Sequence, residues 1–162
     1  MEAMIVLVLW VILFMLVGAL LGVNMYTVIC LSDLANDFIN PHDSSNRINK
    51  LVVPEFVIHI VQTGLFFGVG SWSLVAVNTP LALFHLRSYL RGSCFMDVTE
   101  IFNQLESEKQ TRMFKITFYA IVFIAIIYRL TECAVNTFLT QDGKIMAAQF
   151  LKEAAASNMH HF

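Results

Sequence analysis

Apolar residues occupy most of this chain in long runs, and two polar stretches separate them. The first run covers about residues 3–31, and residues 4–21 within it carry no charge. A helix of roughly 20 apolar residues crosses the hydrocarbon core of a bilayer. The run starts without a positively charged segment and is longer than the apolar core of a signal peptide. We therefore expect it to be a retained membrane-spanning helix.

The middle apolar region, residues 51–90, is too long for one membrane span and has room for two short ones. Gly64, Gly68 and Gly70 lie near its centre, where a tight break between two helices would fit. A last apolar run covers about residues 113–139. The pattern predicts an all-α integral membrane protein. Its domain, residues 1–139, would hold four transmembrane helices, at about 3–31, 52–69, 71–90 and 113–139, with the middle two short. A tail, residues 140–162, would be a short helix or disordered.

The first polar stretch covers residues 32–50. It contains Asn40, Pro41 and Asp43, a composition that is typical of turns. We interpret this stretch as a water-exposed loop, and we place Pro54 in the first turn of the helix that follows it.

The second polar stretch, residues 87–112, contains an amphipathic segment. Asp97 and Glu100 are three residues apart, as in a capping box, and predict a short helix over Val98–Lys109. Its apolar residues recur at helical spacing. They are Val98, Ile101, Phe102 and Leu105. Such a helix either packs on the end of the bundle or is offered to the membrane surface or to a partner.

Polar residues inside the expected spans are candidates for function, because ionisable groups are costly in a membrane. Glu55, His59 and Gln62 are spaced so that they share one helix face, and the small residues Gly64 and Gly68 follow them. These five residues form either a surface that contacts a partner or, for the polar three, a hydrogen-bond network inside the bundle. In the last span, Arg129 and Glu132 are spaced to form an ion pair.

The composition excludes several classes of function. Hydrophobic residues make up 57% of the chain and charged residues only 14%, whereas a soluble domain carries roughly 25% charged residues. The net charge of −2 gives no basic surface for nucleic acid. The sequence has no pairing of a nucleophile with a base and no metal-ligand spacing. It therefore predicts no enzyme, no metal site and no cofactor.

Basic residues indicate the topology. Seven of the ten lie on or beside the two polar stretches. They are Arg47, Lys50, Arg87, Arg91, Lys109, Arg112 and Lys115. Four spans place both stretches on one side of the membrane, which the positive-inside rule identifies as cytosolic, and leave both termini in the lumen. Three spans would put the two basic stretches on opposite sides.

Three segments of the sequence resemble the cornichon family, and most closely its plant-like branch. They are LSDLANDFINPHDSSNRINKLVVPEF (31–56), NTPLALFHLRSYL (78–90) and DVTEIFNQLESEK (97–109), the last of which is followed by RMFK. The three segments occur in the order of the family, and the similarity covers about residues 1–138. The chain departs from the family in its C-terminal part, which carries Arg129, Glu132 and a longer tail.

The resemblance implies a four-helix membrane fold and a role in early secretion. A cornichon-like protein is expected to be a cargo receptor of the endoplasmic reticulum membrane. It would bind transmembrane client proteins, load them into COPII vesicles and cycle to the Golgi. The I-F-x-x-L stretch in the second cytosolic loop of the family engages the COPII coat, and here it corresponds to Ile101, Phe102 and Leu105. The family also implies an alternative function, an auxiliary subunit of an ion channel or transporter. The expected partners are clients, the coat, the lipid bilayer and possible further copies of the chain.

Overall fold

The computed structural model describes residues 2–138 together with residues 145 and 152. The chain forms four helices, α1 (Glu2–Ala35), α2 (Pro41–Gly68), α3 (Trp72–Leu90) and α4 (Ile101–Thr137). Among these described residues there is no strand, and the prediction of an all-helical chain is confirmed. The tail helix expected within 140–162 lies outside the described residues, apart from residues 145 and 152.

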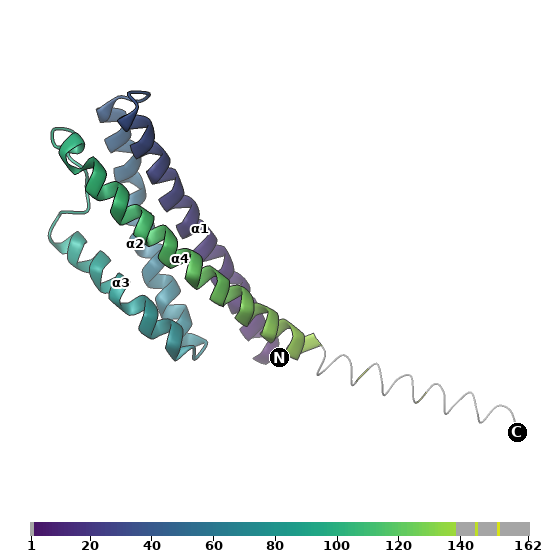
Figure 1. Cartoon of the computed structure of the whole chain (residues 1–162). Helices are drawn as coiled ribbons and strands as arrows, with labels where there is room; N and C mark the ends of the chain where they lie inside the picture. Colours follow the sequence, from purple (N-terminus) through teal and green to yellow (C-terminus); the bar gives the residue numbers. More distant parts are fainter. Residues whose placement is uncertain (1, 139–144, 146–151, 153–162) are drawn as a thin grey trace, which may run out of the picture.

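Each helix runs antiparallel to the one before it (Figure 1). α1 packs against both α4 and α2, and α2 packs against α3, whereas α3 and α4 touch very little. Residues 69–71 connect α2 to α3 in a tight turn, in which Gly70 has a φ of 75°. Glycine adopts this left-handed conformation without strain. The predicted break between two helices in the middle region is therefore confirmed.

The apolar core of the bundle lies chiefly between α1 and α4. On each of these helices the buried residues recur every three or four positions and form one stripe. Phe66 of α2 and Leu81 of α3 complete the cluster. The stripe residues are Trp10, Leu13, Val17 and Leu20 on α1, and Tyr119, Val122 and Ile126 on α4. The two stripes explain why α1 and α4 form the main helix pair.

The first polar stretch is largely helical, and its prediction as a loop is wrong. Asn40 is the N-cap of α2, and its side-chain oxygen accepts a hydrogen bond of 3.0 Å from the backbone N–H of His42. Pro41 follows at the first helical position, where its fixed φ suits a helix and its missing N–H costs nothing. The Asn-Pro pair therefore starts a helix instead of forming a turn. Pro54 consequently lies inside α2, and not in a first turn as predicted.

The polar residues of this segment hold the α3–α4 loop in place. Asn49 is paired with the backbone of Met96, since its Nδ2 donates to the Met96 carbonyl (3.0 Å) and its Oδ1 accepts from the Met96 N–H (2.8 Å). The hydroxyl of Ser45 donates to the same carbonyl at 2.8 Å. The loop that joins α3 to α4 is thus bonded to the first half of α2.

The predicted separate amphipathic helix is also wrong, because α4 is continuous from Ile101 to Thr137. Asp97 does not cap this helix. Its carboxylate instead accepts from the backbone N–H (2.9 Å) and the hydroxyl (2.8 Å) of Thr99, and these bonds hold the pKa of Asp97 below its usual range. The N-cap is Glu100, whose side chain makes no capping bond. The amphipathic segment is therefore the first part of the last long helix.

Three of the described helices, α1, α2 and α4, are long and apolar enough to cross a membrane. α3 is not among them, although its 19 residues are long enough, because polar residues such as Asn78, His85 and Arg87 make it less apolar. Length and composition thus support a membrane protein with at least three spans. The count of four stays a prediction.

Candidate functional site

A buried carboxylate connects all four helices. Glu55 of α2 is fully buried, and its Oε2 accepts a hydrogen bond from Nη1 of Arg112 on α4. Its Oε1 accepts from Nζ of Lys115, also on α4, at 2.9 Å, and from Nδ2 of Asn24 on α1 at 3.3 Å. Nε2 of His85 on α3 lies 3.7 Å from the same oxygen. We call Glu55, Asn24, His85, Arg112 and Lys115 the Glu55 cluster.

The charges of the cluster are nearly balanced. Arg112 and Lys115 provide two positive charges against the one negative charge of Glu55. Glu108, which is partly exposed, provides a second carboxylate at 3.9 Å from Nε of Arg112. Lys115 also lies over the ring of Phe56, with its Nζ 5.5 Å from the centroid. Burial of so many charges is tolerated because each has a partner of the opposite sign or a π-face.

The sequence did not identify the partners of Glu55. Arg112 and Lys115 were assigned to the border of a polar loop, yet both are only 4% exposed. The signal that could have found them is the spacing 112, 115, 119, 122 and 126, which places the two cations on the apolar stripe of α4. A cation on a buried stripe requires an anion on a facing helix.

The predicted polar stripe of α2 lies inside the bundle. Glu55, His59 and Gln62 are all fully buried, and they share one face as predicted. Nε2 of His59 donates to the backbone carbonyl of Asn78 on α3 at 3.3 Å. The two polar atoms of Gln62 have no hydrogen-bond partner among the described residues. Glu55 and His59 therefore belong to a hydrogen-bond network inside the bundle, and Gln62 is buried beside them without joining it.

Gly64 and Gly68 lie on the opposite, outer face of α2. A Cβ atom added to either glycine would meet nothing within 4 Å, so no other helix of the bundle covers them. Exposed apolar side chains surround them, among them Ile60 (51% exposed) and Phe67 (60% exposed). The structure therefore separates the five predicted client-binding residues into three internal ones and two external ones.

The I-F-x-x-L stretch is divided in a similar way. Ile101 is fully buried in an apolar cluster with residues of α1, α2 and the α3–α4 loop, and Leu105 packs against that cluster. Phe102, by contrast, is 59% exposed. Of the alternatives for this amphipathic segment, Ile101 and Leu105 show the first, since both pack on the end of the bundle. The cluster around Ile101 consists of Cys30, Leu31, Leu34, Ile48 and Met96.

Arg129 and Glu132 form the predicted ion pair, with Nη1 of Arg129 at 3.1 Å from Oε2 of Glu132. Both side chains are about half exposed, at 46% and 45%. They line a cavity of about 660 Å³ between the start of α1, the α2–α3 turn and the second half of α4. This end of the bundle is opposite to the end that holds Ile101.

The Glu55 cluster yields a prediction for stability. Glu55→Gln keeps the shape of the side chain but removes the carboxylate that binds the buried Lys115, and it leaves Arg112 with the partly exposed carboxylate of Glu108 at 3.9 Å. Removal of one partner from a buried ion pair typically costs about 3–5 kcal/mol. We expect a strongly lowered midpoint when thermal unfolding of the full-length protein in mild detergent is followed by circular dichroism. Glu132→Gln, in the exposed pair, is the matched control and should cost about 1 kcal/mol or less. Equal midpoints for both variants would contradict the structural role of the cluster.

Comparisons of the sequence with known proteins identify its family. The family described as "Cornichon protein" matches residues 6–128. "Protein cornichon homolog 2" of rice is 41% identical over 140 residues, which are 86% of this chain and 94% of that protein. "Protein cornichon homolog 4" of Arabidopsis thaliana is 34% identical over 80% of this chain and 94% of its own length. "ER-derived vesicles protein erv14" of Schizosaccharomyces pombe is 36% identical over 77% of this chain and 88% of its own length. The chain therefore belongs to the cornichon family.

Proposed function

We propose that this protein is a cargo receptor that binds transmembrane clients in the endoplasmic reticulum and couples them to the COPII coat for export to the Golgi. The observation that carries the proposal is the match to the cornichon family over residues 6–128. The similarity to a protein named for vesicles derived from the endoplasmic reticulum supports it. The three long apolar helices are consistent with a receptor that meets its clients within the membrane.

The proposed topology has four spans, with both termini in the lumen and both connecting loops in the cytosol. The contacts between Asn49 and Met96 bring the α1–α2 and α3–α4 loops to the same end of the bundle. Arg47, Lys50, Arg87 and Arg91 lie near that end, as the positive-inside rule requires of a cytosolic side. α3 would then cross as a short span, and its polar Asn78 and His85 are buried against the bundle.

The proposed client surface is the outer face of α2. Helices associate in membranes where small residues allow their backbones to approach closely. Gly64 and Gly68 provide such a place, and the exposed Ile60 and Phe67 lie beside it. Glu55, His59 and Gln62 would act on client binding from inside, because they hold α2 in position without touching the client.

The proposed coat contact is the I-F-x-x-L stretch, with distinct roles for its residues. Phe102 is available to a cytosolic partner, since it is the exposed member of the three. Ile101 and Leu105 would present it by packing the start of α4 onto the bundle. A large apolar side chain in water gains roughly 1.5–3 kcal/mol when a partner buries it.

The topology predicts which positions a cytosolic reagent can reach. In a protein without its native cysteines, single cysteines at Asn46 and Ser107 should react with a thiol reagent that does not cross membranes. A cysteine at Ser73, in the first turn of α3, should react only after permeabilisation. All three positions are exposed, so burial would not mask them. Opposite accessibility of Asn46 and Ser107 would exclude four spans, and labelling of Ser73 from the cytosol would exclude the proposed orientation.

The client surface predicts the effect of a bulky residue at Gly64. Gly64→Leu should fold, because its side chain meets open space, but it should hold a client helix away from the backbone of α2. A loss of about 1.4 kcal/mol would reduce client capture about tenfold, as measured by co-purification from mild detergent. The same change at Gly18 of α1, where space is equally open, is the control and should leave capture unchanged. Normal yields of all clients with Gly64→Leu would place the client surface elsewhere.

The coat contact predicts different phenotypes for neighbouring residues. Phe102→Ala should insert, fold and hold clients, yet remain in the endoplasmic reticulum with them, because loss of roughly 1.5–3 kcal/mol weakens coat binding about 10- to 100-fold. Ile101→Ala should instead destabilise the protein by about 2–5 kcal/mol, because it opens a cavity in a packed cluster. The measurements are localisation by microscopy and thermal unfolding of each variant.

Phe38 provides the matched control for this experiment. It lies in the α1–α2 loop and is 80% exposed, so Phe38→Ala removes an exposed phenylalanine at the same end of the bundle. This variant should leave the reticulum normally. Normal export of Phe102→Ala would argue against coat binding and would favour the auxiliary-subunit function, which needs no coat contact.

A further inference from the structure

An apolar groove runs between α3 and α4. It exists because α3 packs on α2 while α4 packs on α1, so the facing sides of α3 and α4 are hardly covered. The groove has a volume of about 540 Å³. Its lining is apolar over most of its length and includes Val77, Pro80, Leu81 and Phe84 from α3 and Phe114 and Phe118 from α4. The polar lining residues are Gln110, Thr111 and Lys115 of α4.

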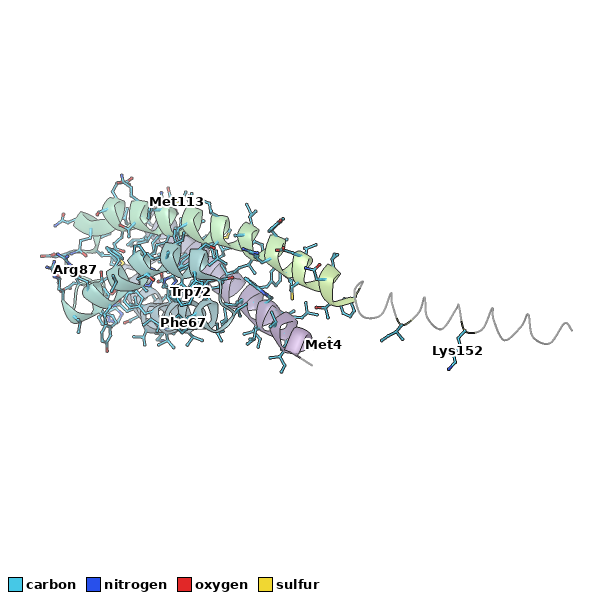
Figure 2. All side chains as sticks on the ribbon, turned by 90° about the horizontal axis from the view of Figure 1, so that it is seen from below. Met4, Phe67, Trp72, Arg87, Met113 and Lys152 are labelled. Atoms are coloured by element: carbon cyan, nitrogen blue, oxygen red, sulfur yellow. The ribbon has the colours of Figure 1, made fainter. Side chains whose placement is uncertain are left out.

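The end of this groove nearest the α3–α4 loop is basic. A second cavity, of about 450 Å³, adjoins it there and shares Phe84 and Thr111 with it. Arg87 and Arg91, one helical turn apart at the end of α3, line this cavity with the hydroxyls of Ser88 and Ser93. Both arginines are exposed, and neither forms an ion pair with any residue that the structure describes. In Figure 2, Arg87 lies at the end of the bundle far from Met4.

The Glu55 cluster lies next to this end and, with Glu108, leaves its net positive charge unchanged. A small third cavity shares Ser88, Ser93 and Glu108 with the basic one and reaches Arg112 and Lys115. Nε of Arg112 is buried and has no hydrogen-bond partner among the described residues, although the carboxylate of Glu108 lies 3.9 Å away. Four cations, two of them exposed, therefore surround this region against the two carboxylates of Glu55 and Glu108.

We propose that the α3–α4 groove binds a membrane glycerophospholipid with an anionic headgroup. An acyl chain would lie along Val77, Leu81, Phe84 and Phe118, and the phosphate would be bound by Arg87 and Arg91. The planar guanidinium group of arginine matches phosphate oxygens with paired N–H donors. Basic pockets between membrane helices are typical sites for anionic lipid headgroups.

The arrangement fits a lipid better than a client helix. A lipid is amphipathic in the same order as the site, with an apolar part inside the membrane and an anion at its boundary. A helix in the groove would bring an apolar surface to Arg87 and Arg91 unless it carried an acidic residue at that height. The site does not depend on the proposed transport function. Only the leaflet from which the lipid comes, the cytosolic one, follows from the proposed topology.

The test uses the full-length protein in phosphatidylcholine nanodiscs. The probe is a phosphatidylinositol monophosphate with a photoactivatable diazirine in its acyl chain, compared with a phosphatidylcholine that carries the same label. We expect the anionic probe to cross-link to the segments 77–84 and 114–118, identified by mass spectrometry of the peptides. The double variant Arg87→Gln, Arg91→Gln should bind it on the order of 30-fold more weakly. The variant Val77→Trp keeps both arginines but fills the groove, and it should abolish the cross-links.

Controls separate this site from general attraction to a charged surface. The double variant Arg47→Gln, Lys50→Gln also removes two positive charges at this end of the bundle, but from a different face. It should leave the cross-links unchanged. The water-soluble glycerophosphoinositol monophosphate should compete poorly, because it lacks the acyl chains. Equal labelling by the phosphatidylcholine probe, equal loss in the control variant or full competition by the soluble headgroup would overturn the proposal. The proposal would also be overturned if a co-purified client helix displaced the lipid probe from the groove.

Discussion

The fold depends on the burial of one carboxylate, that of Glu55, among groups from the other three helices. Lipid solvates apolar side chains as well as protein does, so apolar contact alone drives membrane helices together only weakly. A buried charge is different, because its cost is offset only where its partners meet it with correct geometry. Arg112 and Lys115 reach Glu55 from α4, Asn24 reaches it from α1, and His85 lies beside it from α3. The cluster therefore specifies which helices are neighbours and at what height they pack.

This inward use of polar groups determines the character of the outer surfaces. Because Glu55, His59 and Gln62 face the interior, the exposed residues of α2 between 53 and 68 are all apolar residues or glycines, a surface suited to another helix. Arg112 and Lys115 bind Glu55. The cations of that region that remain for an external anion are therefore Arg87 and Arg91. The proposed client face and the proposed lipid groove thus lie on different sides of the same bundle.

Sequence patterns predicted those features that depend on neighbours along the chain. The apolar runs predicted the helices and their order, and the spacing of Arg129 and Glu132 predicted their ion pair. The helical start at Pro41 was missed, because a polar helix face that binds a loop, as Ser45 and Asn49 do, resembles a loop in composition. A helix was predicted from Val98, close to the start of α4 at Ile101, but its continuation into the last span was missed, because charged residues separate the two parts along the chain. The hydrogen-bond partners of Glu55 were missed because they lie 31 to 60 positions away along the chain. Only the folded bundle brings them together.

The double hydrogen bond between Asn49 and the backbone of Met96 has a mechanical consequence. An amide side chain that both donates to and accepts from the backbone of one residue restrains sliding and rotation between the two segments. α2 and the loop before α4 are therefore mechanically coupled. A tilt of α2 within the bilayer would be transmitted directly to the start of α4, and a push on that end would tilt α2 in return.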